Sequence, residues 1–164
     1  SLAQRTEHPS GQGLVFLLED GTVSSIVVAG SNAAWPTDAI EPLRAHIASA
    51  RAVLLQREIP EHVNVAVAEV AVAHGVLVFQ DVGGEDRPIT DDLLSKLAFI
   101  APNAPELQRL TGMPTSTFAE AVAAARSLQV RGAQQVLVTL GGRGAFLLDR
   151  TGAVSSQPAC AVPG

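Results

Sequence analysis

The sequence has little of what several functional classes require. A single cysteine, Cys160, excludes an internal disulfide and any metal site built from several cysteines. Basic residues are few, because 11 Lys and Arg stand against 16 Asp and Glu, so the basic face needed for nucleic-acid binding is missing. The longest apolar stretch, residues 63–73, is interrupted by Asn64 and Glu69 and falls short of the roughly 20 residues of a membrane-spanning helix. We therefore expect an intracellular protein with neither nucleic acid nor membrane as partner.

Several catalytic motifs are also missing. There is no G-x-S-x-G nucleophile turn, no Walker A sequence, and no G-x-G-x-x-G opening a predicted helix. The four histidines are far apart in sequence, and two of them, His62 and His74, lie about 120° apart around one predicted helix. That spacing does not suit a shared metal ion, so solvent-exposed or helix-capping histidines are the favoured interpretation of His8, His46, His62 and His74.

What is present is enough apolar material for one domain, with 47% hydrophobic residues in a chain of 164. Residues 14–18 and 23–29 are apolar, β-branched-rich runs joined by an Asp-Gly pair, which predicts a β-hairpin. A helix is expected to start between Thr37 and Pro42. Further on, buried strands are predicted at 52–56, 76–80, 98–100 and 136–140, and closing strands at 145–148 and 153–157.

Helical patterns separate these strands. Residues 60–74 fit a helical stripe better than a period of two over their whole length, and Gly75 is the expected C-cap. Helices are also predicted at 91–96, at 103–110 and from Thr117, which forms a capping box with Glu120, to Arg131. Strands alternating with helices predict right-handed crossovers, so the fold class is a three-layer α/β core with a mainly parallel sheet and the hairpin standing apart.

The carboxyl ends of the parallel strands are where ligands bind in such folds. One candidate there is a glycine-rich segment whose backbone N–H groups could cradle a phosphate, with two polar side chains as extra donors. The alternative is a hairpin turn. The segment is Thr139, Leu140, Gly141, Gly142, Arg143 and Gly144.

Three further side chains follow strands at the same edge. Asn103 and Glu106 suit the N-cap and N3 positions of a helix, but a helix start also attracts anions, and Glu106 could hold Mg²⁺ through water. Glu58 is either an exposed charge at a corner or a carboxylate that accepts hydrogen bonds from a polyol. The residues alone leave both alternatives open.

These segments occur in a fixed order along the chain. In order and spacing the sequence resembles the ribokinases of the pfkB carbohydrate kinase family, and most of all those of plants and green algae. The resemblance implies a central sheet flanked by helices and a small β-lid over the sugar, with residues 1–32 in the lid region and 33–164 in the core. Its motifs are residues 10–13, 30–32, 55–60, 81–84, 101–106, 110–115 and 138–144.

The resemblance also implies residue roles. Glu58 matches the acceptor of a sugar hydroxyl, and Asn103 with Glu106 matches the motif that organises Mg²⁺ and the nucleotide phosphates, the carboxylate acting mainly through water. Residues 139–144 match the nucleotide-binding loop, with Gly142 where serine is usual. Residues 81–84, Asp-Val-Gly-Gly, depart from the Asn-Pro-Ala-Pro of bacterial ribokinases, so the shape of that part of the active-site edge is not predicted.

The implied activity is ATP- and Mg²⁺-dependent phosphorylation of the 5-hydroxyl of D-ribose to ribose 5-phosphate, with K⁺ as a further cofactor bound outside this chain. The family's Gly-Ala-Gly-Asp motif, with its catalytic base, is expected after Gly164, and its diglycine motif before Ser1. We therefore expect an internal fragment without a catalytic residue, inactive alone. Another sugar or nucleoside kinase, or an inactive kinase-like scaffold, are the alternatives. The resemblance suggests a homodimer formed through the lid, in plastid or cytoplasm.

Overall fold

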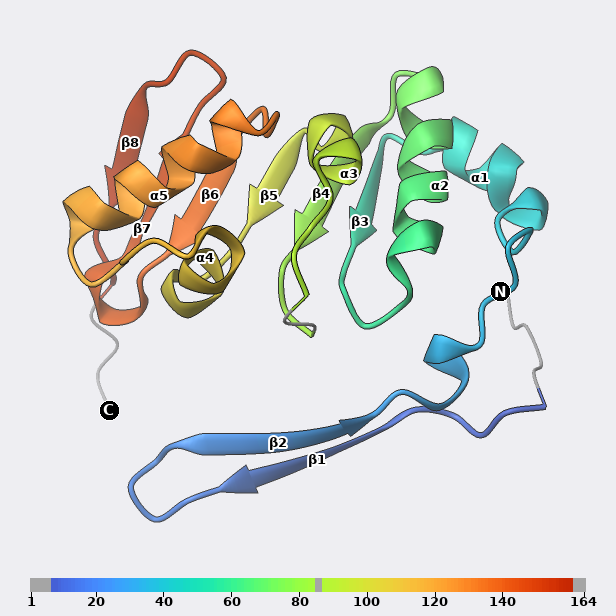
Figure 1. Ribbon diagram of the computed structural model, residues 1–164, viewed down its shortest axis with the longest axis horizontal. Helices are drawn as coiled ribbons and strands as arrows, with labels where there is room; N and C mark the ends of the chain where they lie inside the picture. The colour runs from blue at the N-terminus through green and yellow to red at the C-terminus, as the bar shows by residue number, and fades with distance from the viewer. Residues whose placement is uncertain (1–6, 85–86, 161–164) are drawn as a thin grey trace.

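A computed structural model of the chain describes residues 7–84 and 87–160. It consists of a two-stranded hairpin and a six-stranded sheet covered by helices, with the hairpin well separated from the sheet (Figure 1). The predicted lid region and the loop after the second core strand each include residues outside this description, namely 1–6 and 85–86.

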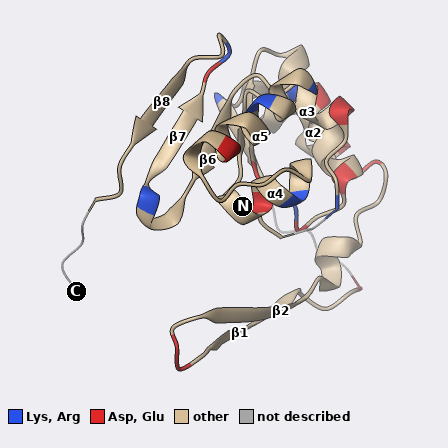
Figure 2. Cartoon of the chain, turned by 60° about the vertical axis from the view of Figure 1, so that its left-hand side comes forward, with Lys and Arg blue, Asp and Glu red and all other residues tan. Residues whose placement is uncertain are grey.

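The hairpin prediction is confirmed. Strands β1 (Gln12–Leu17) and β2 (Val23–Val28) pair antiparallel, from Gln12 opposite Val28 to Leu17 opposite Val23. Asp20 shapes the turn, because its carboxylate accepts hydrogen bonds from the backbone N–H of Thr22 at 2.9 Å and from its hydroxyl at 2.6 Å. No charged residue lies along either strand, as Figure 2 shows, although their large apolar side chains are exposed.

The core sheet has the predicted topology. Strands β3 (Ala52–Leu55), β4 (Leu77–Asp81), β5 (Phe99–Ala101) and β6 (Val136–Thr139) are parallel neighbours in chain order. Strands β7 (Ala145–Leu148) and β8 (Val154–Gln157) complete the sheet antiparallel. The strand expected from residue 76 starts one residue later, because the backbone N–H of Val76 still donates to Ala71 in the preceding helix.

The helices follow the predicted pattern with one exception. The expected start of the first helix between Thr37 and Pro42 is wrong, because the chain first forms a 3₁₀ turn, η2 (Glu41–Leu43), with Pro42 in it. A further short turn, η1 (Gly30–Ala33), follows the hairpin. The helices are α1 (Arg44–Ser49), α2 (Glu61–Ala73), α3 (Asp91–Lys96), α4 (Ala104–Thr111) and α5 (Phe118–Val130).

The ends of these helices follow local sequence signals. The capping box of Thr117 with Glu120 forms at the start of α5. At the end of α2 the C-cap is His74, one residue before the predicted Gly75, which follows it with a φ of 71°. Within the described part of the chain, no helix is long and apolar enough to cross a bilayer.

The two faces of the sheet differ. Figure 1 and Figure 2 agree that the described helices lie on one face, where Val78 and Ile100 are fully buried. On the other face, Leu54 of β3 is 79% exposed and Leu77 of β4 is 51% exposed. In residues 7–84 and 87–160 no helix covers that second face. The α/β class and the mainly parallel sheet flanked by helices are confirmed, and this chain supplies the helices of one side.

Candidate functional site

The carboxyl ends of the four parallel strands meet at one edge of the sheet. Figure 1 shows the arrowheads of β3, β4, β5 and β6 pointing toward the hairpin. The segments that follow these strands carry the side chains that the sequence singled out, from Glu58 after β3 to the glycine-rich loop after β6. The fold therefore gathers them along a single edge, at the position where ligands bind in parallel α/β sheets.

A hollow of about 240 Å³ lies between the base of the hairpin and this edge. The hairpin side contributes small or branched apolar residues, and the core side contributes the β3–α2 corner together with the segment after β4. Glu58 is exposed and lines the hollow. Its lining consists of Val27, Ala29, Ala33, Arg57, Glu58, Ile59, Pro60, Gly84 and Arg87.

Glu58 is set in place by its neighbours. Its backbone N–H donates to the side-chain oxygen of Gln56. Gly84 lies beside Glu58 with a φ of 108°, and a Cβ added there would lie 2.6 Å from Cγ of Glu58. Only glycine tolerates both that backbone conformation and that approach. Gly84, in the part of the edge whose shape the sequence did not predict, is thus the residue against which Glu58 lies.

Asn103 and Glu106 form a capping box at the start of α4. The Oδ1 atom of Asn103 accepts from the backbone N–H of Glu106 at 2.9 Å, and Oε2 of Glu106 accepts from the backbone N–H of Asn103 at 2.7 Å. The capping interpretation is therefore confirmed. It uses only one oxygen of the Glu106 carboxylate and does not compete with a second role for the other oxygen.

The second oxygen of Glu106 lies toward the turn after β4. A Cβ added at Gly83 would lie 3.9 Å from Oε1 of Glu106 and 3.0 Å from Oδ1 of Asp81. That Asp81 oxygen accepts from the backbone N–H of Gly83 at 2.9 Å. Two carboxylates thus flank Gly83. Hard oxygen donors of this kind suit Mg²⁺, which usually takes one or two carboxylates and completes its shell with water and phosphate oxygens.

The glycine-rich loop contains a short 3₁₀ helix, η3 (Gly141–Arg143), and internal backbone hydrogen bonds fix its conformation. The backbone N–H of Leu140 donates to Gly144 at 2.8 Å, and that of Gly144 donates to Gly141 at 2.9 Å. Gly142 is exposed, and a Cβ there would meet no described atom within 4 Å. The loop is therefore open to a ligand at Gly142 and internally braced on both sides of it.

Two residues of this loop also make contacts that the sequence did not predict. Arg143, predicted as an extra donor to a ligand, donates from Nη1 to the backbone carbonyl of Ser116 at 2.6 Å. Gly144 is required by packing, because a Cβ on it would lie 2.0 Å from the carbonyl oxygen of Gln157 in β8. Sequence reasoning had no signal for either contact, since both partners lie far away along the chain.

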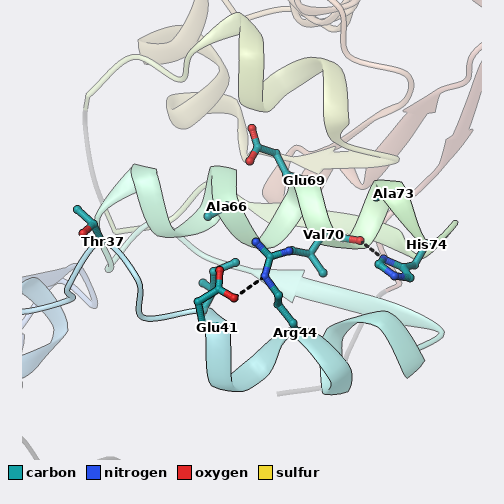
Figure 3. A pocket seen from close by; sticks show the side chains of 9 residues that line it. Thr37, Glu41, Arg44, Ala66, Glu69, Val70, Ala73 and His74 are labelled. Atoms are coloured by element: carbon teal, nitrogen blue, oxygen red, sulfur yellow. Dashed lines mark hydrogen bonds and ion pairs between the residues drawn. The ribbon is translucent and has the colours of Figure 1, made fainter.

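A second hollow, also of about 240 Å³, lies between α1 and α2 (Figure 3). Arg44 points into it and donates from Nε to Glu41, on the same side of the hollow, at 2.8 Å, which lowers the pKa of the Glu41 carboxyl. His74 closes one end through a hydrogen bond of 2.8 Å between Nδ1 and the carbonyl of Val70, as expected for a capping histidine. No candidate site residue lines this hollow, so it is distinct from the site at the strand ends.

Comparison with known proteins gives a consistent result. A model of the family described as pfkB family carbohydrate kinase matches residues 1–162. A ribokinase of Arabidopsis thaliana is 44% identical over 140 residues, which are 85% of this chain and 37% of that protein. A deoxyribokinase of Salmonella typhi is 28% identical over 141 residues, 86% of this chain and 46% of that protein.

Solved structures resemble the chain as well. The structure of Arabidopsis thaliana ribokinase complexed with ribose and ATP superposes with a TM-score of 0.86 and 40% identity, over 93% of this chain and 49% of that one. Ribokinase from Giardia lamblia gives the same TM-score at 19% identity over 100% of this chain and 52% of that one, which shows the fold. The chain spans about half the length of these structures.

Proposed function

The chain belongs to the pfkB family of carbohydrate kinases, and on that premise we propose that it is the middle part of an ATP- and Mg²⁺-dependent ribokinase. The enzyme would transfer the γ-phosphoryl group of ATP to the 5-hydroxyl of D-ribose and give ribose 5-phosphate. The observation that carries this proposal is the single edge on which a carboxylate-lined hollow and a glycine-rich loop follow neighbouring strands. The 44% identity to the Arabidopsis ribokinase supports the choice of ribose.

Glu58 is the proposed sugar ligand. Its carboxylate is exposed in the hollow between the hairpin base and the core, and Gly84 supports it from the side. An ionised carboxylate is an acceptor only, so it suits the hydroxyl donors of a polyol. A site built around such an acceptor discriminates strongly against analogues that lack the hydroxyl. The hairpin base would shield the bound sugar from water.

Asn103, Glu106 and the loop 139–144 are the proposed nucleotide and metal ligands. Glu106 would hold Mg²⁺, mainly through water, with the carboxylate oxygen that the capping box leaves unused. The exposed backbone at Gly142 would meet the nucleotide, and the start of α4 would favour the phosphates electrostatically. When bound, Mg²⁺ neutralises charge that develops on the transferred phosphoryl group.

The proposal assigns no catalytic base to residues 1–164. The base for the attacking hydroxyl, the anion hole and a K⁺ site would belong to further residues of a longer protein. This fits the matched relatives, of which the chain spans 37% and 46% for the two named above. The chain would then supply the sugar corner and part of the nucleotide and metal apparatus.

The hairpin is the proposed dimer contact. Its strands carry no charged residue, and their large apolar side chains are exposed to solvent, for example Phe16 at 48% and Ile26 at 55%. Uncovered apolar strands of this kind are an association surface, because burying them removes apolar area from water and satisfies their open edges. Two hairpins packed against each other would close the lid region of a homodimer.

Kinetic and product analysis distinguishes a ribokinase from another sugar or nucleoside kinase of the family and from an inactive scaffold. The full-length protein is incubated with Mg-ATP and, in turn, with D-ribose, 2-deoxy-D-ribose, fructose and adenosine, and the products are identified by phosphorus NMR. The proposal predicts the highest kcat/KM for D-ribose and a phosphate on its 5-hydroxyl. A higher kcat/KM for another acceptor would assign the protein to a different kinase of the family. Absence of turnover with all four acceptors would favour an inactive scaffold.

A further inference from the structure

Arg57 is buried at the corner that carries Glu58. Its side chain is 5% exposed, whereas its neighbours Gln56 and Glu58 are exposed. Successive residues of the corner therefore point in opposite senses, with Arg57 inward and Glu58 outward into the hollow. A guanidinium always carries its charge, so burial is costly unless its donors find partners.

The partners of Arg57 lie in the segment that follows the Gly83-Gly84 turn. Its Nη2 atom donates to the carbonyl of Arg87 and, at 3.4 Å, to the carbonyl of Pro88. The same atom lies 3.9 Å from Oε2 of Glu61, in the first turn of α2. Arg57 thus connects the β3–α2 corner to the segment that follows the neighbouring strand β4.

This connection fixes the position of Gly84 relative to Glu58 on the two sides of the hollow. Gly84 precedes the segment that Arg57 holds, and its Cα side faces Cγ of Glu58 closely enough that a Cβ would lie 2.6 Å away. Arg57, Glu58, Gly84 and Arg87 all line the hollow. A shift of the held segment would therefore remove the support on which the Glu58 side chain rests.

The same segment is also held by contacts that other residues make with it. Arg131, at the end of α5, donates from Nη2 to the carbonyl of Ile89 at 2.7 Å and forms an ion pair with Asp91. Oε1 of Glu61 accepts from the N–H and hydroxyl of Thr90. Arg131 is thus a matched comparison for Arg57, because it is an arginine that binds the same segment without contacting Glu58.

We infer that Arg57 is a positioning residue that sets the affinity of the site for its sugar by fixing Glu58 against Gly84. The inference rests on the proposed function, since it assumes that Glu58 binds the acceptor. Arg57 acts through Glu58 and does not touch the phosphates, so its loss affects binding of the sugar and leaves the nucleotide side unchanged. A purely structural arginine would instead change stability alone.

The test compares Arg57→Met, Arg57→Lys and Arg131→Met in the full-length protein, measuring KM for D-ribose, KM for ATP, kcat and melting temperature. Without Arg57, Glu58 would lose its fixed position and with it most of one charged hydrogen bond to the sugar. The strength of such a bond predicts a rise of about tenfold in the ribose KM of Arg57→Met. Its kcat and its KM for ATP are expected to stay unchanged. Lysine keeps the charge without the planar guanidinium, so the ribose KM of Arg57→Lys should lie between those of the wild-type protein and Arg57→Met. Arg57→Lys also keeps the test possible if Arg57→Met folds poorly.

Arg131→Met should lower the melting temperature without changing the ribose KM. Equal rises of the ribose KM in Arg57→Met and Arg131→Met would overturn the inference, as would an unchanged KM in Arg57→Met. Hydrogen exchange of the Gly84 amide, measured without sugar in Arg57→Met and Arg131→Met, separates this inference from the proposed function. Exchange that is faster in Arg57→Met than in Arg131→Met supports the positioning role even if wild-type protein fails to phosphorylate ribose, and equal exchange in the two variants contradicts it.

Discussion

Asn103 and Thr139 pair as a parallel β-bridge at the carboxyl ends of β5 and β6. The backbone N–H of Thr139 donates to the carbonyl of Pro102 at 3.2 Å beside it. The bridge places the N-cap of α4 directly against the first residue of the glycine-rich loop. Two segments that are far apart in sequence therefore lie side by side at the strand-end edge.

The Asn103 and Glu106 variants separate capping from metal and phosphate binding. Asp caps as well as Asn, and Gln keeps an acceptor at N3, so Asn103→Asp and Glu106→Gln should melt near the wild-type temperature. Asn103→Asp adds a negative charge beside the phosphates, and Glu106→Gln weakens attraction for Mg²⁺. We expect turnover to fall by about tenfold or more in each, and the Mg²⁺ requirement of Glu106→Gln to rise.

Glu120 supplies the matched control for that experiment. It occupies the same N3 position in the capping box of α5 and is not among the residues proposed to bind the nucleotide or the metal. Glu120→Gln should therefore leave both turnover and the Mg²⁺ titration unchanged. Wild-type turnover in Asn103→Asp and Glu106→Gln at every Mg²⁺ concentration would reduce the motif to a helix cap.

Gly84→Ala tests the contact that supports Glu58. The added Cβ would lie 2.6 Å from Cγ of Glu58, so either the turn or the glutamate must move. We expect the KM for ribose to rise by about tenfold, since misplacing a charged hydrogen-bond acceptor removes most of its contribution. Gly75→Ala is the control, because Gly75 also has positive φ but has nothing within 4 Å. Equal KM values in the two variants would show that Glu58 does not depend on Gly84.

Ile26→Asp tests the proposed hairpin dimer. A charge placed on the apolar hairpin opposes its burial against a second copy, so light scattering should show a monomer where the wild-type protein is a dimer. Val130→Asp is a matched control, because Val130 is 88% exposed at the end of α5. It should leave the dimer intact. A dimer that survives Ile26→Asp with unchanged dissociation constant would place the interface elsewhere.

The isolated chain is expected to be inactive and prone to association. Leu54 and Leu77 lie on a sheet face that no described helix covers, and uncovered apolar surface of this kind promotes aggregation. The proposal also assigns no catalytic base to the chain. Ribose-dependent release of ADP by purified protein of residues 1–164 would contradict this expectation.

Local signals explain which parts of the fold the sequence predicted. The helix at 91–96 and the capping boxes at Asn103 and Thr117 depend on side chains within one turn, and they formed as predicted. The start of the first helix was wrong because Pro42 fits a 3₁₀ turn as well as a helix start. Glu58 and the glycine-rich loop were candidates because each follows a predicted strand, and their proposed roles came from the family resemblance.

The supporting residues of the site could not be found in this way. Arg57 looks like one charge beside another at a corner, and only the fold shows it buried against the carbonyls of Arg87 and Pro88. Gly84 and Gly144 are likewise required by contacts with Glu58 and Gln157, which lie on other strands or corners. Contacts between neighbouring strands are set by topology, which single-residue patterns do not encode.

Binding of D-ribose to Glu58→Gln in the full-length protein, measured by calorimetry, tests the central claim most directly. The substitution keeps the shape of the side chain and removes its charge, and a charged hydrogen bond is worth about 1.5 to 3 kcal/mol, so ribose affinity should fall roughly ten- to a hundredfold. Glu69→Gln, on the exposed side of α2 beside the other hollow, should bind ribose like the wild-type protein. Equal ribose affinities for Glu58→Gln and wild-type protein would contradict the account and leave Glu58 as a surface charge.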